Sequence, residues 1–313
     1  MRLLLYARGG GMGHLNRAYS IAMALKPYGI TPLVFTTSTL VPSQIYTQLS
    51  VMRWPVLADA AGAVFKTSAW GEHLSRTHIQ TLIRALAPDL MAVDTFDNGP
   101  ENELQDLPFA KRVIQRDGTR PRSSQHLLVN PLGLGYVLNT SPAALAHPDL
   151  ARAFWNHDAR KGPLVVVAHN GDAMETRAFF ERILHYFSGT AYQVRLASLL
   201  PCLKPEWRSL WCSTYPLAPW FSAVDLLIGG GGYNLVAEAQ CYGVRGYFQA
   251  FDRPIDRQWE RLEQQSSFYE GTSREVFLAT VQDLLSQAKQ APLALSACQG
   301  AEAVAKVLAE YLT

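Results

Sequence analysis

Two clusters of glycine constrain the fold of this 313-residue chain more than any other feature. Residues 9–13 contain four glycines and lead into His14, and residues 229–232 are four consecutive glycines. Each cluster follows a short apolar run and precedes a stretch with helical periodicity. Glycine lets a ligand approach the backbone, and a helix start offers N–H groups and the positive end of the helix dipole. Each turn is therefore either a phosphate site or a tight strand-to-helix connection that binds nothing.

Apolar runs typical of buried strands alternate with helical periodicity through both halves of the chain. We expect strands at residues 3–7, 32–36, 90–94, 112–115, 164–168, 192–197, 210–214, 225–228 and 244–248. We expect helices at residues 15–25, 72–86, 174–187, 234–241, 254–265, 274–290 and 301–312. Continuous apolar strands separated by helices indicate an α/β protein with parallel sheets covered on both faces.

The alternation weakens between about residues 119 and 163, a stretch rich in proline and glycine. We therefore expect two domains, residues 1–145 and 146–313, with the last helix a candidate to pack back on the N-terminal domain.

Composition excludes several classes of protein. A net charge of +2 argues against a nucleic-acid partner held by bulk positive charge, and 48% hydrophobic residues argue against disorder. No run of about 18 apolar residues is present, and no C-x-x-C spacing suggests a metal site. Reduced buried thiols are expected at Cys202, Cys212, Cys241 and Cys298. These features favour a cytoplasmic protein.

The first glycine cluster fits neither common nucleotide motif. In G-x-G-x-x-G the sixth position is glycine, but here it is His14 when counted from Gly9 and Asn16 when counted from Gly11. No G-x-x-x-x-G-K-[ST] sequence occurs either. A nicotinamide, flavin or P-loop nucleotide site is therefore not expected.

The residues around both clusters resemble those of GT-B glycosyltransferases close to the lipid II-forming N-acetylglucosaminyltransferases, a family 28-like group. Gly-Met-Gly-His-Leu-Asn-Arg, ending at Arg17, is similar to that family's glycine-rich loop. Residues 225–238 are similar to its nucleotide-sugar motif, and residues 251–259 resemble its Asp/Gln loop. The resemblance implies two Rossmann-like domains facing across a cleft. It also implies a nucleotide diphosphate sugar, expected to be a UDP-sugar, bound mainly by the C-terminal domain.

The expected donor site combines glycine backbone with a few polar side chains. Backbone N–H groups near the second cluster are candidates for the diphosphate, and the resemblance places a ribose-binding carboxylate at Glu238. Asp256 and Gln258 match the loop that holds donor-sugar hydroxyls, although Trp259 stands where the family has a second glutamine. The turn after residues 164–168, beginning at His169, is a further candidate. The donor-binding set is Gly11, Gly13, Asn170, Gly230, Gly231, Gly232, Tyr233, Asn234, Glu238, Asp256 and Gln258.

Three residues are candidates for the catalytic base. His14 ends the first glycine cluster, and imidazole titrates near neutral pH. Asp94 and Asp97 lie at and after the end of an expected strand, where side chains face the ligand crevice of such sheets. No D-x-D sequence is present, so we expect neither a metal ion nor a cofactor.

Three functions remain open from the sequence. The first is a metal-independent, inverting glycosyltransferase acting on an unidentified hydroxyl acceptor. The second is a nucleotide-sugar hydrolase, because Gly-x-Gly-His-x-x-Arg in residues 11–17 also resembles the hydrolase of pseudaminic acid synthesis. The third is a non-catalytic nucleotide-sugar-binding subunit with a protein partner. A basic stretch is either solvated charge or a contact for an acidic acceptor or membrane surface: Lys111, Arg112, Arg116, Arg120 and Arg122.

Overall fold

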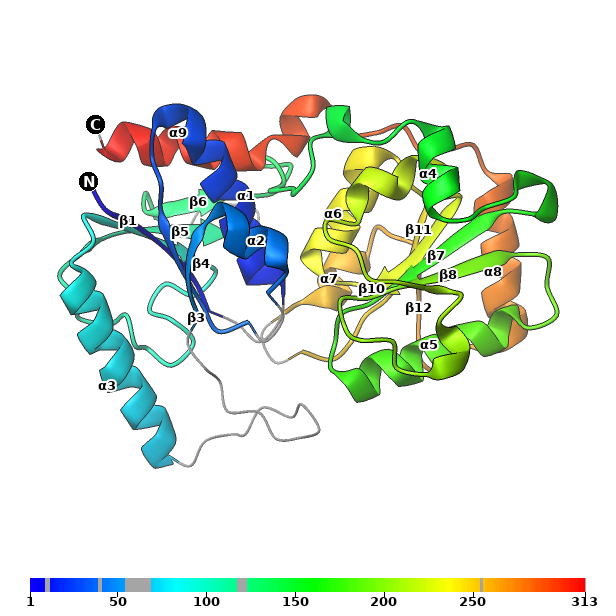
Figure 1. Cartoon of the computed structure of the whole chain (residues 1–313), viewed down its shortest axis with the longest axis horizontal. Coiled ribbons are helices and arrows are strands. Elements are labelled where there is room, and N and C mark those ends of the chain that lie inside the picture. Colours follow the sequence, from blue (N-terminus) through cyan, green and yellow to red (C-terminus); the bar gives the residue numbers. More distant parts are fainter. Residues whose placement is uncertain (9–11, 39–40, 54–68, 117–122, 254–255, 313) are drawn as a thin grey trace. The chain divides into compact units, whose positions relative to one another are not determined.

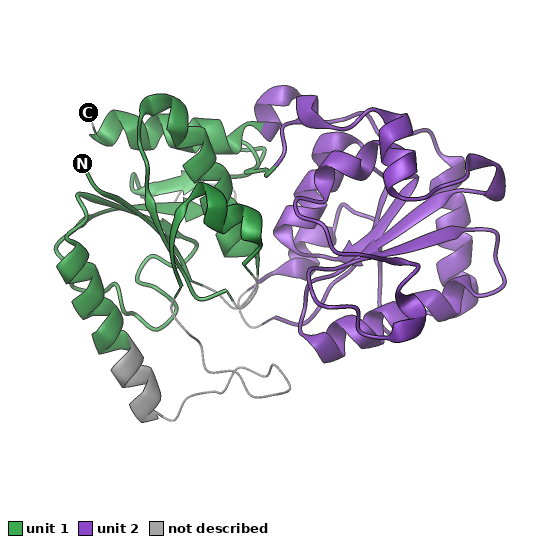
Figure 2. Ribbon diagram, viewed as in Figure 1, with its two compact units in different colours: residues 1–139, 299–313 green, residues 140–298 purple. Residues whose placement is uncertain are grey.

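The chain forms two compact units (Figure 2). The computed structural model describes residues 1–8, 12–38, 41–53, 69–116, 123–253 and 256–312. Unit 1 comprises Met1–Asn139 and Gln299–Thr313, and unit 2 comprises Thr140–Cys298. The chain thus leaves unit 1 at residue 139, where a boundary after residue 145 was expected. It returns for the last helix, α9 (Gly300–Leu312), which packs against α1 (Met12–Leu25) within unit 1.

Unit 1 is built on a six-stranded sheet in which all paired strands are parallel. Its strand order is β3-β2-β1-β4-β5-β6. The helices α1 and α9 cover one face, and α3 (Ala69–Leu86) covers the other through Ile79 and Ile83, while α2 (Ser43–Gln48) precedes β3 (Figure 1). The strands are β1 (Leu3–Ala7), β2 (Leu33–Thr36), β3 (Ser50–Arg53), β4 (Leu90–Asp94), β5 (Ala110–Gln115) and β6 (His126–Leu128).

Unit 2 repeats this arrangement with a second six-stranded parallel sheet, ordered β12-β11-β10-β7-β8-β9. Its strands are β7 (Leu164–Ala168), β8 (Gln193–Ala197), β9 (Trp211–Cys212), β10 (Leu226–Gly230), β11 (Gly246–Gln249) and β12 (Ser267–Phe268). Its helices are α4 (Pro148–Phe154), α5 (Ala173–Phe187), α6 (Tyr233–Tyr242), α7 (Gln258–Leu262) and α8 (Arg274–Ser286).

Both sheets have the same topology when strands are numbered within each unit. The first strand pairs with the second and the fourth, which is the order of the doubly wound Rossmann fold. The winding therefore reverses between β1 and β4 in unit 1 and between β7 and β10 in unit 2. Ligands of such sheets bind outside the carboxyl ends of the strands at this reversal. The α/β class expected from the sequence is confirmed.

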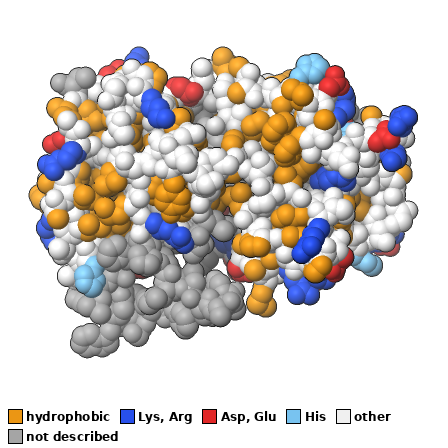
Figure 3. Space-filling view, viewed as in Figure 1, with side chains coloured by type: hydrophobic (Ala, Val, Ile, Leu, Met, Phe, Trp, Pro, Cys, Tyr) orange, Lys and Arg blue, Asp and Glu red, His pale blue; other side chains and the backbone are white. Residues whose placement is uncertain are grey.

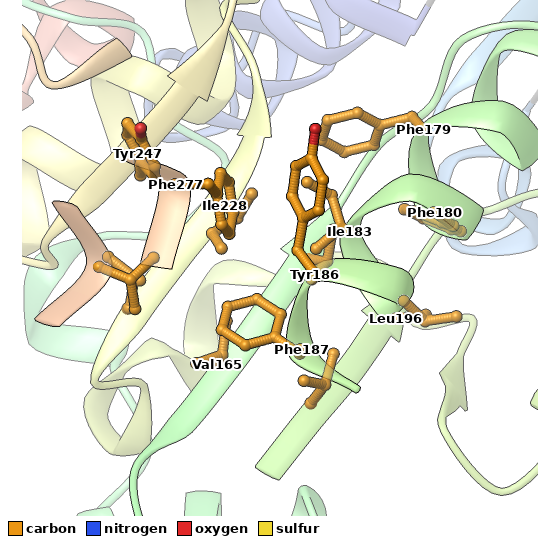
Figure 4. Close-up of a cluster of buried hydrophobic side chains, with 14 of the residues drawn as sticks. Val165, Phe179, Phe180, Ile183, Tyr186, Phe187, Leu196, Ile228, Tyr247 and Phe277 are labelled. Atoms are coloured by element: carbon orange, nitrogen blue, oxygen red, sulfur yellow. The ribbon is translucent and has the colours of Figure 1, made fainter. Parts of the chain in front are cut away.

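An aromatic core holds α5 and α8 on one face of the sheet of unit 2 (Figure 4). Phe179, Ile183 and Phe187 lie on α5, and Phe277 on α8 packs with them against strand side chains such as Val165. The three α5 residues follow the spacing of four that places side chains on one helix face. Burial of such rings is the main favourable term that fixes α5 and α8 against the sheet.

Two element boundaries differ from expectation and change the sites. Helix α1 begins at Met12, so Gly13 and His14 lie in its first turn rather than in the preceding loop. Strand β10 extends through Gly230, so the expectation that all four glycines at 229–232 form the turn is wrong. Gly229 pairs with both neighbouring strands, and a Cβ there would lie 2.7 Å from the carbonyl oxygen of Ala168. Glycine is thus required at this position by close strand packing.

Because α9 packs on unit 1, shortening a buried side chain of this helix should lower the free energy of unfolding. Leu308 is fully buried, so Leu308→Ala should lower the free energy of unfolding by about 2–5 kcal/mol through lost burial and a cavity. Lys306→Ala is the matched control, because its side chain is exposed on the same helix. Chemical denaturation measures both. Equal, small effects would contradict the packing of α9 on unit 1.

Candidate functional site

In unit 1 the sheet reversal brings together a histidine, an aspartate and an arginine. His14 and Arg17 lie on α1, which follows β1, and Asp94 is the last residue of β4. His14 Nδ1 lies 2.5 Å from Asp94 Oδ2. Arg17 donates from Nε to Asp94 Oδ1 at 2.8 Å and from its terminal nitrogen to Oδ2 at 2.6 Å. Asp94 thus receives hydrogen bonds from both side chains, and the Arg17 pairing is bidentate.

The Asp94 carboxylate stays ionised in spite of its burial. Burial by itself would raise the pKa of Asp94, but the charges and hydrogen bonds of Arg17 and His14 outweigh it and hold this pKa well below its usual range. Because a carboxylate only accepts hydrogen bonds, the hydrogen between Asp94 and His14 belongs to Nδ1.

The pairing with Asp94 leaves the second ring nitrogen of His14 for chemistry. Its side chain is 14% exposed and stacks on the ring of Phe96, with centroids 5.5 Å apart. Among the described residues, no other hydrogen bond reaches His14. With Nδ1–H fixed by Asp94, Nε2 carries the lone pair that can accept a proton. The contact with Asp94 therefore fixes the ring tautomer and leaves Nε2 as the nitrogen that can accept a proton.

The other two candidates for the catalytic base, Asp94 and Asp97, differ in burial and in their contacts with His14. Asp94 is only 3% exposed and its oxygens are already bonded, so its geometry suits the positioning of His14 rather than direct contact with an acceptor. Asp97 is half-exposed and lies 3.5 Å from Lys111 Nζ, which also donates to the Asn98 side chain. No contact within the described residues joins Asp97 to His14.

The other unit 1 residues singled out from the sequence are two glycines and the basic stretch. Gly13 has ordinary space around it, and Gly11 lies outside the described residues. Part of the basic stretch is engaged within the unit, because Lys111 binds the Asp97 turn and Arg112 lies over the Tyr311 ring at 4.3 Å. Lys and Arg side chains on the face shown in Figure 3 are scattered rather than gathered in one patch. Arg120 and Arg122 lie outside the described residues.

In unit 2 the second glycine cluster supplies the start of helix α6, whose N-cap residue has no side chain of its own to cap it. Gly232 is the N-cap of α6, and a Cβ there would meet no heavy atom within 4 Å. The first N–H groups of a helix lack acceptors within the helix and attract anions. The Gly231 N–H is different, because it donates to Gln249 O at 2.7 Å and extends the strand pairing. This amide is therefore engaged within the sheet, and the diphosphate contact expected from it stays a prediction.

Three further donor candidates lie near this helix start. Tyr233 is buried at the start of α6, with Arg261 over its ring at 5.9 Å, and Asn234 follows it, half-buried. Asn170 is exposed after β7, where its side-chain oxygen accepts from Leu199 N at 2.7 Å and from Ser198 Oγ at 3.0 Å. These bonds tie the turn after β7 to the segment after β8.

Glu238 is a buried carboxyl group with no partner among the described residues. It is 8% exposed, and no hydrogen bond or ion pair reaches it in the described part of the chain. Burial alone raises the pKa of Glu238 to about 8. A carboxyl group that burial removes from water, with no cation beside it, is costly to ionise, and this cost is the physical cause of the raised pKa.

Asp256 and Gln258 make bonds within their own segment. Gln258 accepts from Phe251 N at 2.9 Å and donates to Asp256 Oδ2 at 3.0 Å. Arg261 donates to Asp256 Oδ1 and to the carbonyl oxygen of Gly231, both at 2.6 Å. This network fastens the start of α7 to the glycine turn. In the structure, Asp256 and Gln258 therefore hold the shape of this turn. The contact with sugar hydroxyls that the sequence assigned to them stays a prediction.

Sequence reasoning missed four charged residues that organise the two sites. Arg17 holds Asp94, Arg261 holds the glycine turn, and Glu175 joins His169 to Arg253. Arg17 carried a signal, because it lies three residues after His14 on one helix face. The partners of the others lie far along the chain, so no local spacing indicates them.

With the geometry described, the chain can be compared with known proteins. No protein-family model matches the sequence, and no curated protein matches it significantly. Solved structures match along nearly the whole chain. The UDP-GlcNAc 2-epimerase of Methanocaldococcus jannaschii has a TM-score of 0.64 at 13% identity, covering 99% of this chain and 100% of that one.

Glycosyltransferases match over a similar extent. MurG of Acinetobacter baumannii has a TM-score of 0.59 at 12% identity, covering 99% of this chain and 100% of that one. SsfS6 of Streptomyces sp. SF2575, in complex with thymidine diphosphate, has a TM-score of 0.56 at 15% identity, covering 99% and 96%. The expected fold is thereby confirmed: the chain has the GT-B fold of these glycosyltransferases. At these identities the likeness establishes the fold alone.

Two searches of the described residues complete the description. No group of three or more His, Cys, Asp or Glu side chains in the described ranges is arranged to hold a metal ion. No helix within those ranges has the length and apolarity needed to cross a membrane.

The buried ion pair in unit 1 predicts a pH-dependent loss of stability. Arg17→Met leaves Asp94 as an uncompensated buried charge, so the free energy of unfolding should fall by about 3–5 kcal/mol at pH 7. The wild-type pKa of Asp94 is depressed, so its contribution is present above about pH 4 and is lost as pH falls further. The gap between variant and wild type should therefore narrow toward pH 3.

The control for this prediction is Arg152→Met, which removes an exposed ion pair with Asp149. Exposed pairs contribute about 0–1 kcal/mol, so this variant should differ little from wild type at any pH. Urea denaturation at pH 7 and pH 3 measures all three proteins. A gap between Arg17→Met and wild type that is independent of pH would contradict the assignment to Asp94 ionisation.

Proposed function

We propose that this protein is a glycosyltransferase that moves a sugar from a nucleotide diphosphate sugar to an acceptor hydroxyl. We further propose that the nucleotide is UDP, that the reaction inverts the anomeric centre, and that no metal ion takes part. The observation that carries the proposal is the His14–Asp94 pair at the sheet reversal of unit 1. The GT-B fold supports it, since structural neighbours of the chain include several glycosyltransferases.

In the proposed reaction, His14 removes the proton of the acceptor hydroxyl. The acceptor oxygen bonds to the anomeric carbon while the bond from that carbon to the β-phosphate oxygen breaks. The electron pair leaves on the diphosphate, and the proton stays on His14 Nε2. Asp94 is a positioning residue: it fixes the ring tautomer and stabilises the imidazolium that forms. Direct displacement of this kind inverts the configuration.

The donor is assigned to unit 2, where two features suit its two polar parts. The start of α6 beyond Gly232 suits the diphosphate, because helix N–H groups and the helix dipole stabilise negative charge as it develops. The unpartnered Glu238 carboxylate on the same helix suits a ribose diol, whose two hydroxyls both donate. One neighbour binds UDP-GlcNAc and UDP and another binds thymidine diphosphate, which supports a nucleotide diphosphate donor.

Nucleotide-sugar hydrolysis is the second candidate, because the same His14–Asp94 pair would activate a water molecule equally well. Epimerisation is an outcome of the same assay, since the 2-epimerase has a TM-score of 0.64. A panel of UDP-, dTDP- and GDP-sugars with and without hydroxyl acceptors distinguishes these reactions. A glycosylated acceptor supports the proposal, whereas free sugar at full turnover without acceptor indicates the hydrolase. A chain that binds the donor but turns over none of the panel is a binding subunit.

The base assignment predicts a separation of catalysis from binding. His14→Ala should lower kcat by about 10²- to 10⁴-fold, the usual contribution of general base catalysis, and leave the donor Kd unchanged. Asp97→Asn is the control, because this half-exposed carboxylate pairs with Lys111 and not with His14. Steady-state kinetics and donor titration measure both variants. Full activity of His14→Ala, or an equally large loss in Asp97→Asn, would refute the assignment.

The ribose assignment predicts opposite effects of one substitution on stability and binding. Since the pKa of Glu238 is raised to about 8, the free protein loses stability as pH rises from about 4.5 to 8. The glutamine in Glu238→Gln stays neutral at every pH. At pH 8 the free energy of unfolding of this variant should therefore be about 1–3 kcal/mol higher than that of wild type. It should also bind the donor roughly 10- to 100-fold more weakly, because the charged acceptor is lost.

The same group gives donor binding a pH dependence. Ribose hydroxyls favour the ionised carboxylate, so wild-type affinity should weaken as pH falls below about 8, where binding must release the proton that Glu238 carries in the free protein. Titration calorimetry with UDP at pH 6, 7 and 9 measures the trend in wild type and in Glu238→Gln. The exposed Glu260→Gln is the control and should match wild type. A pH trend retained in Glu238→Gln would assign it to another group.

A further inference from the structure

A backbone turn of unusual geometry begins at Asp94, the last residue of β4. The Phe96 N–H donates to the Asp94 carbonyl oxygen at 2.9 Å, across the single residue Thr95. Thr95 has a φ of 69°, in the left-handed region that a β-branched residue rarely adopts. A hydrogen bond across one residue with this φ is the strained form of the γ-turn. Such a conformation persists only where the surrounding structure holds it.

The turn places Phe96 against the candidate base. The Phe96 ring stacks on the His14 ring, with centroids 5.5 Å apart and planes inclined by 27°. Asp94, the first residue of the same turn, holds His14 through Nδ1. A hydrogen bond at one ring atom fixes a point, and a contact with the ring face fixes the plane. The two residues together therefore determine the direction in which Nε2 faces.

A fully buried glutamate anchors the segment that follows this turn. Glu103 is 0% exposed, and its Oε1 accepts from the Tyr6 hydroxyl at 2.5 Å and forms an ion pair with Arg8 Nη1 at 2.6 Å. Its Oε2 accepts from the Glu101 N–H at 2.8 Å. Burial and the Glu103 charge raise the pKa of Tyr6, so the phenol keeps the proton that it donates. Glu103 thus ties the segment after β4 to the end of β1.

Backbone hydrogen bonds connect this anchor to the turn. Leu104, the next residue, is fully buried in the core beneath α3, and its N–H donates to the Asn98 carbonyl oxygen at 2.8 Å. The Gly99 N–H donates to the Phe96 carbonyl oxygen at 2.8 Å. Gly99 has a φ of 79°, and a Cβ there would collide with the Glu103 carboxyl group. Glycine therefore lets the chain fold closely over the anchor.

We propose that Phe96 and Glu103 are positioning residues for the base: Phe96 fixes the plane of the His14 ring, and Glu103 holds the strained turn that places Phe96 there. This inference rests on the proposed function and adds to it the means by which the base keeps its direction. Buried ion pairs often add little to stability over apolar residues of similar volume. The geometry that Glu103 imposes on this turn is therefore its main consequence.

The test measures catalysis, donor binding and the His14 ring in the same variants. Phe96→Leu removes the stacked ring, and Glu103→Gln removes the ion pair with Arg8 at constant side-chain size. Each should lower kcat roughly 10- to 100-fold, because a displacement of about 1 Å at the reacting groups has an effect of this order. The donor Kd should change less than about 2-fold, since the donor is assigned to unit 2.

Histidine NMR reports on the ring itself. The His14 C–H signals, identified by their loss in His14→Ala, should move downfield in Phe96→Leu, because the ring current of the stacked phenyl group is lost. They should move in the same direction in Glu103→Gln. A residue that contributed only to stability would leave these signals of the folded protein unchanged.

Ile83→Ala is the control for lost stability. Ile83 is fully buried in the same core, in the last turn of α3, and the hydrogen bonds that hold the turn at Thr95 do not involve it. This variant should be destabilised but keep the wild-type kcat and His14 signals. A loss of kcat as large as that of Glu103→Gln would assign the effect to stability and refute the positioning role.

The outcomes separate this inference from the proposed function. If wild type converts none of the nucleotide sugars, with or without an acceptor, the proposed function fails and the inference with it. If wild type is active and both Phe96→Leu and Glu103→Gln keep its kcat and His14 signals, the positioning role is refuted while the proposed function stands. A loss in Phe96→Leu alone would refute the role of Glu103.

Two further measurements cover the case in which Glu103→Gln fails to fold. Tyr6→Phe keeps the ring that stacks on Phe35 at 5.0 Å and removes only the hydroxyl that donates to Glu103. It should move the His14 signals in the same direction by less. In wild type, nuclear Overhauser contacts should join the rings of Phe96 and His14. Unchanged His14 signals in Tyr6→Phe, or the absence of these contacts, would overturn the proposal.

Discussion

The order of strands in two parallel sheets is the constraint on which the rest of the structure depends. In each unit the first strand pairs with the fourth, so the segments that leave these two strands emerge side by side at the carboxyl edge. In unit 1 this brings Asp94 to His14, and in unit 2 it brings His169 to Gly230. Residues that are 80 and 61 positions apart in the sequence thereby become neighbours.

Two buried carboxyl groups, Asp94 and Glu238, differ in whether the described residues give them hydrogen-bond partners. Asp94 receives both Arg17 and His14, so burying its charge costs little and the carboxylate stays ionised. Glu238 is as deeply buried and receives no bond from the described residues, so burial raises its pKa to about 8. The bonds to Asp94 fix the position of the His14 ring, whereas burial without such bonds makes Glu238 costly to ionise. This contrast supports the division of roles between base positioning and donor binding.

Glycine serves two different needs within four residues of unit 2. Gly229 and Gly230 belong to β10; a Cβ would clash with the Ala168 carbonyl oxygen at Gly229 and would lie tightly against the His169 ring at Gly230. Gly232 begins α6 and faces open space, which suits a ligand rather than a packing contact. The fold places both kinds of glycine, but function depends on the chemical groups that can approach the backbone at these positions.

The sequence by itself determined the α/β class, most strands and helices, and the glycine turns, because these follow from short-range periodicity and backbone sterics. It also singled out His14 and Glu238. It missed the short elements β3, β6 and β12, whose few residues carry too little pattern to stand out. Only the tertiary structure decided that Asp94 holds His14, that Gly231 bonds to Gln249, and that Glu175 orients His169. These pairings depend on strand order and on burial, and neither is encoded in the spacing of residues along the chain.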